Sequence, residues 1–206
     1  MKTYYERYWQ KKEILEDFHY KWPVIKKFIP TKRNIHILDF GCGKGTILTE
    51  MQKINPHAYF TAVDVSQKAL NFIKKKDKKT ILRKILDGGS MPFQDNSFDF
   101  IIASDVLEHV YDTENAFFEL SRVLKNKGKI LISVPYNGMI KRTLVALFFF
   151  EFIFEPSTPH IRLYTKNSLT KYLNKYGIKV EKVGYYGRFF PFSNGMYMIG
   201  VKNKKK

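Results

Sequence analysis

The chain has 206 residues, of which 44% are hydrophobic and 27% are charged, and this composition is typical of a single globular domain. It excludes a disordered chain, a collagen-like repeat and a multi-pass membrane protein, and the single cysteine excludes an intramolecular disulfide and a cysteine-built zinc site. Because charged residues rather than an apolar segment follow Met1, we expect no secretory signal and a cytoplasmic location.

The charge is strongly positive, since 36 Lys and Arg residues face 19 Asp and Glu residues and leave a formal net charge of +17. Such an excess favours contact with nucleic acid or with an anionic membrane. Only 7 of the 36 are arginines, however, and specific phosphate recognition favours arginine. We therefore attribute the charge first to composition bias, expect a possible anionic membrane surface as partner, and regard nucleic acid as an improbable one.

Residues 1–33 show a mixed helical pattern that Pro30 closes, and we interpret them as an N-terminal helical cap. Apolar strand patterns then alternate with helical patterns through residues 34–134, which predicts a parallel, doubly wound sheet. The expected strands are 35–40, 59–63, 81–86, 98–103 and 129–134, and the expected helices are 46–54, 66–75 and 114–124.

The C-terminal part, residues 166–206, predicts a helix over 166–176 and two strands over 178–185 and 196–202. The connection between these two strands is too short for a crossover helix, so at least one of them must run antiparallel. The expected fold is therefore α/β, a single domain with a doubly wound, mostly parallel seven-stranded sheet. Residues 34–134 form the cofactor-binding core and 135–165 an insertion that faces substrate or membrane.

A glycine loop follows the first strand, where open α/β sheets bind their ligands. Its glycines are Gly41, Gly43 and Gly45, whereas a dinucleotide fingerprint would need a glycine at Thr46. The acid that precedes the loop, Asp39, would repel a pyrophosphate but suits an ammonium group.

Two further acids extend this site along the edge of the sheet. Asp64 follows the second strand, where a carboxylate can accept hydrogen bonds from both hydroxyls of a ribose. Asp87 and Gly88 follow the third strand, beside the expected place of an adenine. A ligand with an amino-acid end, a ribose, a base and no phosphate matches S-adenosylmethionine.

Six ordered blocks resemble the motifs of class I S-adenosylmethionine-dependent methyltransferases. They are Leu38–Gly45, Val63–Ser66, Asp87–Asp99, Val106–Val110, Arg122–Lys125 and Gly128–Lys129. The resemblance implies a Rossmann-like methyltransferase fold and S-adenosylmethionine as cofactor. The cofactor-binding residues that we expect are Asp39, Gly41, Cys42, Gly43, Gly45, Asp64, Val65, Asp87, Gly88 and Ser104, with Cys42 also interpreted as a small packing residue.

Methyl transfer from a sulfonium requires an acceptor held in line with the methyl group, and a general base only when the acceptor is an oxygen or carbon acid. Two histidines are candidate catalytic bases. His109 follows the fourth strand at the edge that faces the cofactor, and His160 lies in the region after the fifth strand where substrates enter this fold. Either could instead have a purely structural role.

The insertion contains a strongly apolar segment, since ten of the twelve residues from 143 to 154 are apolar. Its longest unbroken apolar run has seven residues, too few to cross a bilayer. We expect this segment to cover an apolar substrate pocket or to rest in a membrane interface on the inner face, with packing in the core as the alternative.

In layout, residues 137–177 resemble the corresponding region of ubiquinone-biosynthesis O-methyltransferases. Those enzymes carry a Glu-x-x-Glu-His motif implicated in binding a divalent cation. Here Asp105 replaces the first glutamate of the motif and Glu108 and His109 follow, so a divalent cation is possible but not expected, and we assign no metal ligands.

The leading interpretation is a methyltransferase that acts on a small, apolar or membrane-derived acceptor, most simply by O-methylation. The Asn/Asp-Pro-Pro-aromatic motif of amino-methylating nucleic-acid enzymes is absent after the fourth strand, where the chain has Ser104 and Asp105. An RNA or protein methyltransferase, or a catalytically silent cofactor-binding subunit, remain the alternatives, and the sequence does not indicate an oligomeric state.

Overall fold

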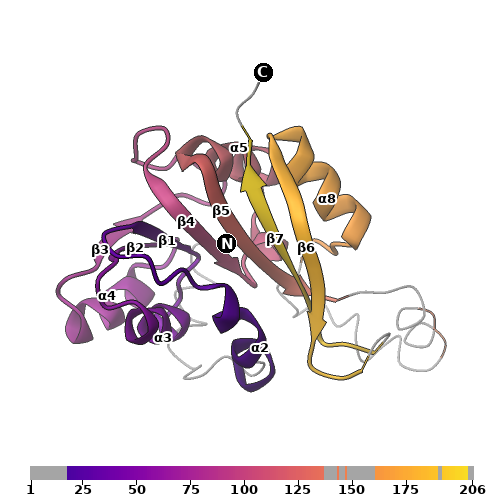
Figure 1. The fold of residues 1–206 in the computed structure, drawn as a ribbon, viewed down its shortest axis with the longest axis horizontal. Coiled ribbons are helices and arrows are strands. Elements are labelled where there is room, and N and C mark those ends of the chain that lie inside the picture. The colour runs from indigo at the N-terminus through magenta and orange to yellow at the C-terminus, as the bar shows by residue number, and fades with distance from the viewer. Residues whose placement is uncertain (1–17, 137–142, 144–146, 148–160, 190–191, 204–206) are drawn as a thin grey trace.

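The computed structural model describes residues 18–136, 143, 147, 161–189 and 192–203. These residues build one seven-stranded sheet with the strand order β3-β2-β1-β4-β5-β7-β6 (Figure 1). The strands are β1 (His36–Phe40), β2 (Tyr59–Asp64), β3 (Ile81–Lys84), β4 (Phe98–Ser104), β5 (Leu124–Pro135), β6 (Ile178–Tyr186) and β7 (Gly195–Lys202). The helices are α2 (Phe18–Ile25), α3 (Thr46–Ile54), α4 (Gln67–Lys76), α5 (Thr113–Val123) and α8 (Lys166–Lys175), with short 3₁₀ turns η1 (Lys26–Phe28) and η2 (Leu107–His109).

The predicted fold class is confirmed. The five strands β3, β2, β1, β4 and β5 pair in parallel, while β7 pairs antiparallel with both β5 and β6. The expected antiparallel late strand is therefore β7, which lies between its two neighbours rather than at the edge of the sheet.

Helices cover both faces of the sheet, and each face has its own apolar core (Figure 1). Successive strand residues point to opposite faces, so Ile101 packs with α5 and α8 while Ile102 packs with α2, α3 and α4. Because β4 is covered on both sides, almost all of its residues are apolar and buried, as its sequence predicts.

Local signals set most helix ends close to their expected positions. Ser66 caps α4, where its hydroxyl accepts a hydrogen bond from the Ala69 amide at 3.3 Å. Thr165 and Ser168 form a reciprocal capping box at the start of α8, and Gly177, with φ of 75°, ends it. The N-terminal helical pattern is described only from Phe18, and its end before Pro30 agrees with the prediction.

Helix α5 ends earlier and β5 begins earlier than the sequence suggests. The expected helix end at Leu124 and strand start at Lys129 are wrong, since the helix ends at Val123 and Leu124 already pairs with Phe98. The cause is the turn before β4, whose backbone amides donate hydrogen bonds to the last carbonyl oxygens of the helix. The Ser97 amide, for example, donates to the Val123 oxygen at 2.8 Å. The predicted third strand is also too long, because β3 ends at Lys84.

The loop between β3 and β4 is fixed to α5 by a guanidinium. Arg122 donates to the buried carboxylate of Glu119 at 2.7 Å and to the main-chain oxygens of Phe93 and Met91 at 2.7 and 3.0 Å. The second oxygen of Glu119 also accepts from the Met91 amide at 2.6 Å. These bonds hold the pKa of the Glu119 carboxyl below its usual value.

No helix among the described residues is long and apolar enough to span a bilayer. Of the apolar segment 143–154, only Thr143 and Leu147 are described, and both are helical and exposed. The rest of this segment, including its expected contacts, lies outside the described residues.

Replacement of Arg122 by Met should lower the free energy of unfolding by about 2–3 kcal/mol, because it leaves the buried Glu119 carboxylate without its cation. Urea unfolding should show a lower midpoint with an unchanged slope. The control is Lys175→Met, which removes an exposed ion pair with Glu114 and should leave the midpoint unchanged. Equal midpoints for Arg122→Met and the wild type would contradict this role.

Candidate active site

The glycine loop turns sharply between β1 and α3 at the carboxyl edge of the sheet. The amides of Gly41 and Cys42 donate to the Val63 oxygen at 2.9 and 3.0 Å, so the loop is tied to the end of β2. Gly41 has φ of 74°, and a Cβ atom there would lie 2.2 Å from a methyl carbon of Val106. Any larger residue would therefore separate the loop from the turn that follows β4.

Asp64 organises this loop from the end of β2. One carboxylate oxygen accepts from the Gly43 amide at 2.9 Å and the other from the Ser66 amide at 2.8 Å. A carboxylate oxygen can accept more than one hydrogen bond, which suits the expected contact with ribose hydroxyls. The expected ribose role is thus compatible with the geometry, which also gives Asp64 a structural role in the turn.

Asp39 lies buried in β1 beside this carboxylate, and its Oδ2 atom has no hydrogen-bond partner within the described part of the chain. Burial, and next the nearby charge of Asp64, raise the pKa of Asp39 to about 7. A buried acid that lacks a partner would be stabilised in its ionised form by an ammonium group, as the sequence analysis expects for the methionyl end.

Cys42 and Val65 flank the acids and contribute packing. Cys42 is buried in the core face that α2, α3 and α4 cover, and burial raises the pKa of its thiol well above the usual range. The thiol therefore stays protonated, which agrees with a packing role. Val65 is partly buried against the opposite core.

The loop with Asp87 and Gly88, beside which we expect the adenine, is held in place by residues that follow β4. Asp87 accepts a hydrogen bond from the Tyr111 amide at 3.0 Å, and the Gly88 oxygen accepts one from the side-chain amide of Asn115. Gly88 has φ of 67°, and a Cβ atom there would lie 2.5 Å from that of Asp112. The loop thus has a defined position next to Asp64, although one Asp87 oxygen already serves the turn.

A buried lysine enters the site from the N-terminal helix α2. Lys21 is fully buried, pairs with the carboxylate of Asp105 and donates to the Ser104 hydroxyl at 3.2 Å. Asp105 also accepts from Ser133 at 3.2 Å and from the Tyr186 hydroxyl at 3.3 Å. Ser104, expected at the methyl-donor side, therefore lies within a network of side chains from α2, β4, β5 and β6.

The sequence did not indicate Lys21 as part of the site. A lysine in an amphipathic helix is normally solvated, and no local signal distinguishes one that is drawn inward by a carboxylate far along the chain. The sequence offered one hint, Asp105, a charged residue that directly follows the buried strand β4.

Glu108 and His109 lie in the η2 turn after β4. Glu108 is 1% exposed, and the Nε2 atom of His109 is 3.9 Å from its carboxylate. Burial, and next the charge of Asp105, raise the pKa of Glu108 well above its usual value, whereas Lys21 acts in the opposite direction. The expected position of His109 at this edge agrees with the structure, and the other candidate base, His160, lies outside the described residues.

The Asp105, Glu108 and His109 set does not have the arrangement of a divalent-cation site. Within the described ranges, no three His, Cys, Asp or Glu residues gather in a way that could hold a metal ion. The ammonium of Lys21 already pairs with Asp105, so the residues present fit a resident lysine rather than a metal.

The last residues of the insertion lie against the same turn. The amides of Ile161 and Arg162 both donate to the main-chain oxygen of Glu108 at 3.1 Å, and the Tyr164 hydroxyl donates to the Leu107 oxygen at 3.3 Å. Burial raises the pKa of Tyr164 to about 12, which keeps this donor protonated. The insertion therefore ends beside Glu108.

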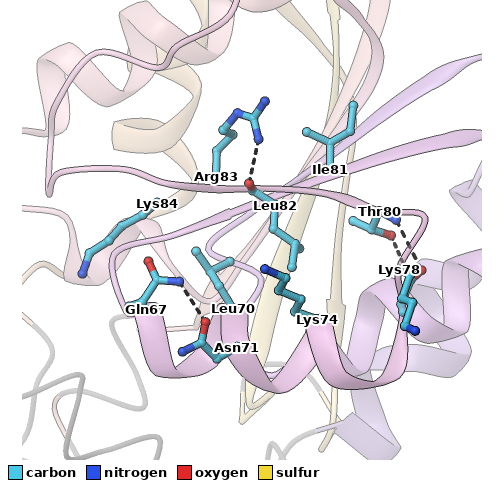
Figure 2. Close-up of a pocket in the computed structure, with 11 residues that line it drawn as sticks. Gln67, Leu70, Asn71, Lys74, Lys78, Thr80, Ile81, Leu82, Arg83 and Lys84 are labelled. Atoms are coloured by element: carbon cyan, nitrogen blue, oxygen red, sulfur yellow. Dashed lines mark hydrogen bonds between the residues drawn. The ribbon is translucent and has the colours of Figure 1, made fainter.

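A separate surface pocket of about 520 Å³ lies between α4 and the edge strand β3 (Figure 2). Figure 2 shows Lys74, Lys78, Arg83 and Lys84 around it, and none of the predicted cofactor residues lines it. Basic residues at the end of α4 and just after it thus border this outer pocket.

Comparison with known proteins agrees with this site. Residues 38–132 match the family described as "Methyltransferase domain". An uncharacterised protein of Methanocaldococcus jannaschii is 37% identical over 122 residues, which cover 59% of this chain and 50% of that protein. A demethylmenaquinone methyltransferase of Lactobacillus johnsonii is 32% identical over 128 residues, which cover 56% of this chain and 52% of that protein. The chain thus spans about half the length of these two curated relatives.

Among solved structures, an S-adenosylmethionine-dependent methyltransferase from Aquifex aeolicus has the same fold. The TM-score is 0.73 at 18% identity, and the match covers 95% of this chain and 97% of the other. By the match over residues 38–132 and by its fold, the chain is similar to S-adenosylmethionine-dependent methyltransferases. The cofactor expected from the glycine loop and its acids is the one named for this structural neighbour.

Replacement of Asp64 by Ala should weaken S-adenosylmethionine binding by roughly 10- to 100-fold, because two ribose hydroxyls lose a charged acceptor worth about 1.5–3 kcal/mol. Calorimetric titration measures the change. The control is Asp99→Ala, which removes bonds to the His36 amide and to Lys125 at the opposite edge of the sheet and should leave the affinity unchanged. Unaltered binding by Asp64→Ala would reject the ribose assignment.

Cofactor affinity should rise between about pH 5.5 and 7.5. Asp39 holds its proton up to a pKa of about 7, and only the ionised form attracts the ammonium of the cofactor. Calorimetry of Asp39→Asn should show weaker binding that no longer depends on pH in this window. Since the unfolded carboxyl loses its proton near 3.8, the wild type should also lose stability as the pH rises from about 4 to 7. A wild-type affinity that is flat in pH would exclude this role for Asp39.

Proposed function

We propose that the protein transfers the methyl group of S-adenosylmethionine to a hydroxyl of a small, apolar, membrane-derived acceptor. The observation that carries this proposal is the meeting of the cofactor acids with the Lys21, Asp105 and Glu108 cluster at one edge of the sheet. The demethylmenaquinone methyltransferase relative supports an apolar acceptor, although it matches this chain over little more than half of its length.

The reaction is an in-line displacement at the methyl carbon. The acceptor oxygen forms a bond to this carbon as the carbon–sulfur bond breaks, so the positive sulfonium becomes a neutral sulfide. The enzyme has to hold the oxygen about 3 Å from the methyl carbon and to exclude water. The hydroxyl proton must leave to a base, for which His109 and His160 are the candidates from the sequence.

The apolar insertion supports an acceptor drawn from a membrane. Its sequence is almost continuously apolar from 143 to 154, and Leu147 is 69% exposed. The positive charge of the chain would draw it to anionic headgroups. We therefore propose a cytoplasmic protein that contacts the inner membrane face peripherally.

The test is methyl transfer from labelled S-adenosylmethionine to cell extract that is separated into lipid, RNA and protein fractions. Label is expected in the lipid fraction, in a product that mass spectrometry identifies as a methyl ether. Leu147→Asp should lower transfer to acceptor in anionic vesicles at least fivefold, with cofactor affinity unchanged. The control is Ile81→Asp, which changes a similarly apolar exposed residue on β3. Label in RNA or protein alone would contradict the proposal.

A further inference from the structure

Buried polar atoms that lack a partner are concentrated at one place in the described parts of the chain. They are Asp39 Oδ2 and both carboxylate oxygens of Glu108. Native proteins leave few such atoms, because each one costs the free energy of its lost hydration. Asp39 lies near the carboxyl end of β1, and Glu108 lies in the η2 turn that follows the paired strand β4, at the edge where α/β sheets bind ligands. Asp39 is accounted for by the cofactor, whereas Glu108 is not.

Lys21 supplies the complementary donor. Its ammonium has three N–H groups, of which Asp105 and Ser104 accept two. The Lys21 ammonium reaches the turn after β4, where it pairs with Asp105, three residues before Glu108, but it forms no ion pair with Glu108 itself. One donor of Lys21 and both carboxylate oxygens of Glu108 thus remain unused in the buried region around this turn.

A purely structural role explains only part of this cluster. The pairing of Lys21 with Asp105 could serve to hold α2 on the sheet, but apolar side chains do this at lower cost than buried charges. Such a role also leaves Glu108 unexplained, because neither of its carboxylate oxygens takes part in a hydrogen bond.

The surroundings of Glu108 place it at the acceptor side. Its main-chain oxygen accepts hydrogen bonds from the amides of Ile161 and Arg162, near the end of the insertion. Its carboxylate is 3.9 Å from His109. Glu108 therefore lies where α2, the turn after β4 and the end of the insertion come together.

We propose that the acceptor hydroxyl bridges Lys21 and Glu108, accepting a hydrogen bond from the ammonium and donating one to the carboxylate. This inference rests on the proposed function and names its acceptor site. As the oxygen–carbon bond forms and the carbon–sulfur bond breaks, the hydroxyl proton passes to Glu108. Lys21 stabilises the negative charge that develops on the oxygen, a task for which a divalent cation would otherwise serve.

The charged neighbours agree with this division of roles. Asp105 neutralises Lys21 and raises the pKa of Glu108, Lys21 lowers it, and His109 and the neutral Tyr164 complete the surroundings. A carboxylate with a raised pKa is a stronger base than an exposed one, and proton transfer is most efficient when its pKa is near the working pH.

The test uses two probes of similar shape, catechol and its dimethyl ether veratrole, titrated calorimetrically into the full-length protein saturated with S-adenosylhomocysteine. The wild type should bind catechol at least tenfold more tightly than veratrole. Lys21→Met and Glu108→Met should each remove this preference, with S-adenosylhomocysteine affinity unchanged. The double variant should be no weaker than either single variant by more than about twofold, because both groups hold the same hydroxyl.

Two surface variants serve as controls, Lys26→Met on η1 and Glu50→Gln on α3, and both should bind catechol like the wild type. Circular dichroism and thermal unfolding establish that each variant is folded, and if Lys21→Met fails to fold, the Glu108→Met result decides. Equal binding of the two probes by the wild type, or a full catechol preference in Glu108→Met, would overturn the proposal. Failure of lipid methylation with the catechol preference intact would reject the proposed function alone.

Discussion

The parallel pairing of β1 with β2 on one side and β4 on the other is the constraint on which the site depends. The strand order reverses here, so the connections leave β1 and β4 toward opposite faces and leave the ends of these strands uncovered by a crossover. In-register pairing of Asp39 with Ala62 and Ile102 brings the ends of β1, β2 and β4 to the same height. The cofactor acids and the Lys21 cluster are neighbours only because of this register.

The glycine loop and Val106 couple the two halves of the site mechanically. The loop that would hold the cofactor touches the turn that carries Glu108, with no space for a side chain between them. A shift of either segment must therefore move the other. This contact gives cofactor and acceptor a fixed relative position, which in-line transfer requires.

Sequence patterns predicted the elements that depend on local signals. Ser66 marks the start of α4, Gly177 marks the end of α8, and the apolar run of β4 indicates a central strand. The patterns failed where a contact distant in sequence determines the secondary structure. Leu124, for example, belongs to β5 rather than to the preceding helix because it pairs with Phe98 of β4. The cofactor acids were likewise predictable as candidates because they lie near the ends of strands, and the structure places Asp39 and Asp64 near the same ends of the paired strands β1 and β2.

Lys21 shows the limit of such reasoning. Its partners, the Ser104 hydroxyl and the Asp105 carboxylate, lie more than eighty positions away, and no periodicity in α2 encodes them. A buried cation of this kind ties the N-terminal helix to the chemistry of the site. One side chain, Lys21, thus ties α2 to the sheet, neutralises Asp105 and contributes to the charge environment of Glu108.

The position of β7 between β5 and β6 has a consequence for how the chain acquires its structure. Strand β6 is made before β7, yet its only partner in the sheet is β7. During synthesis, β6 and the preceding helix α8 therefore cannot join the sheet until β7 has been made. The parallel half of the sheet, from β3 to β5, needs no such delay and can form first. The part of the sheet next to α8 is therefore completed only when β7 takes its place between β5 and β6.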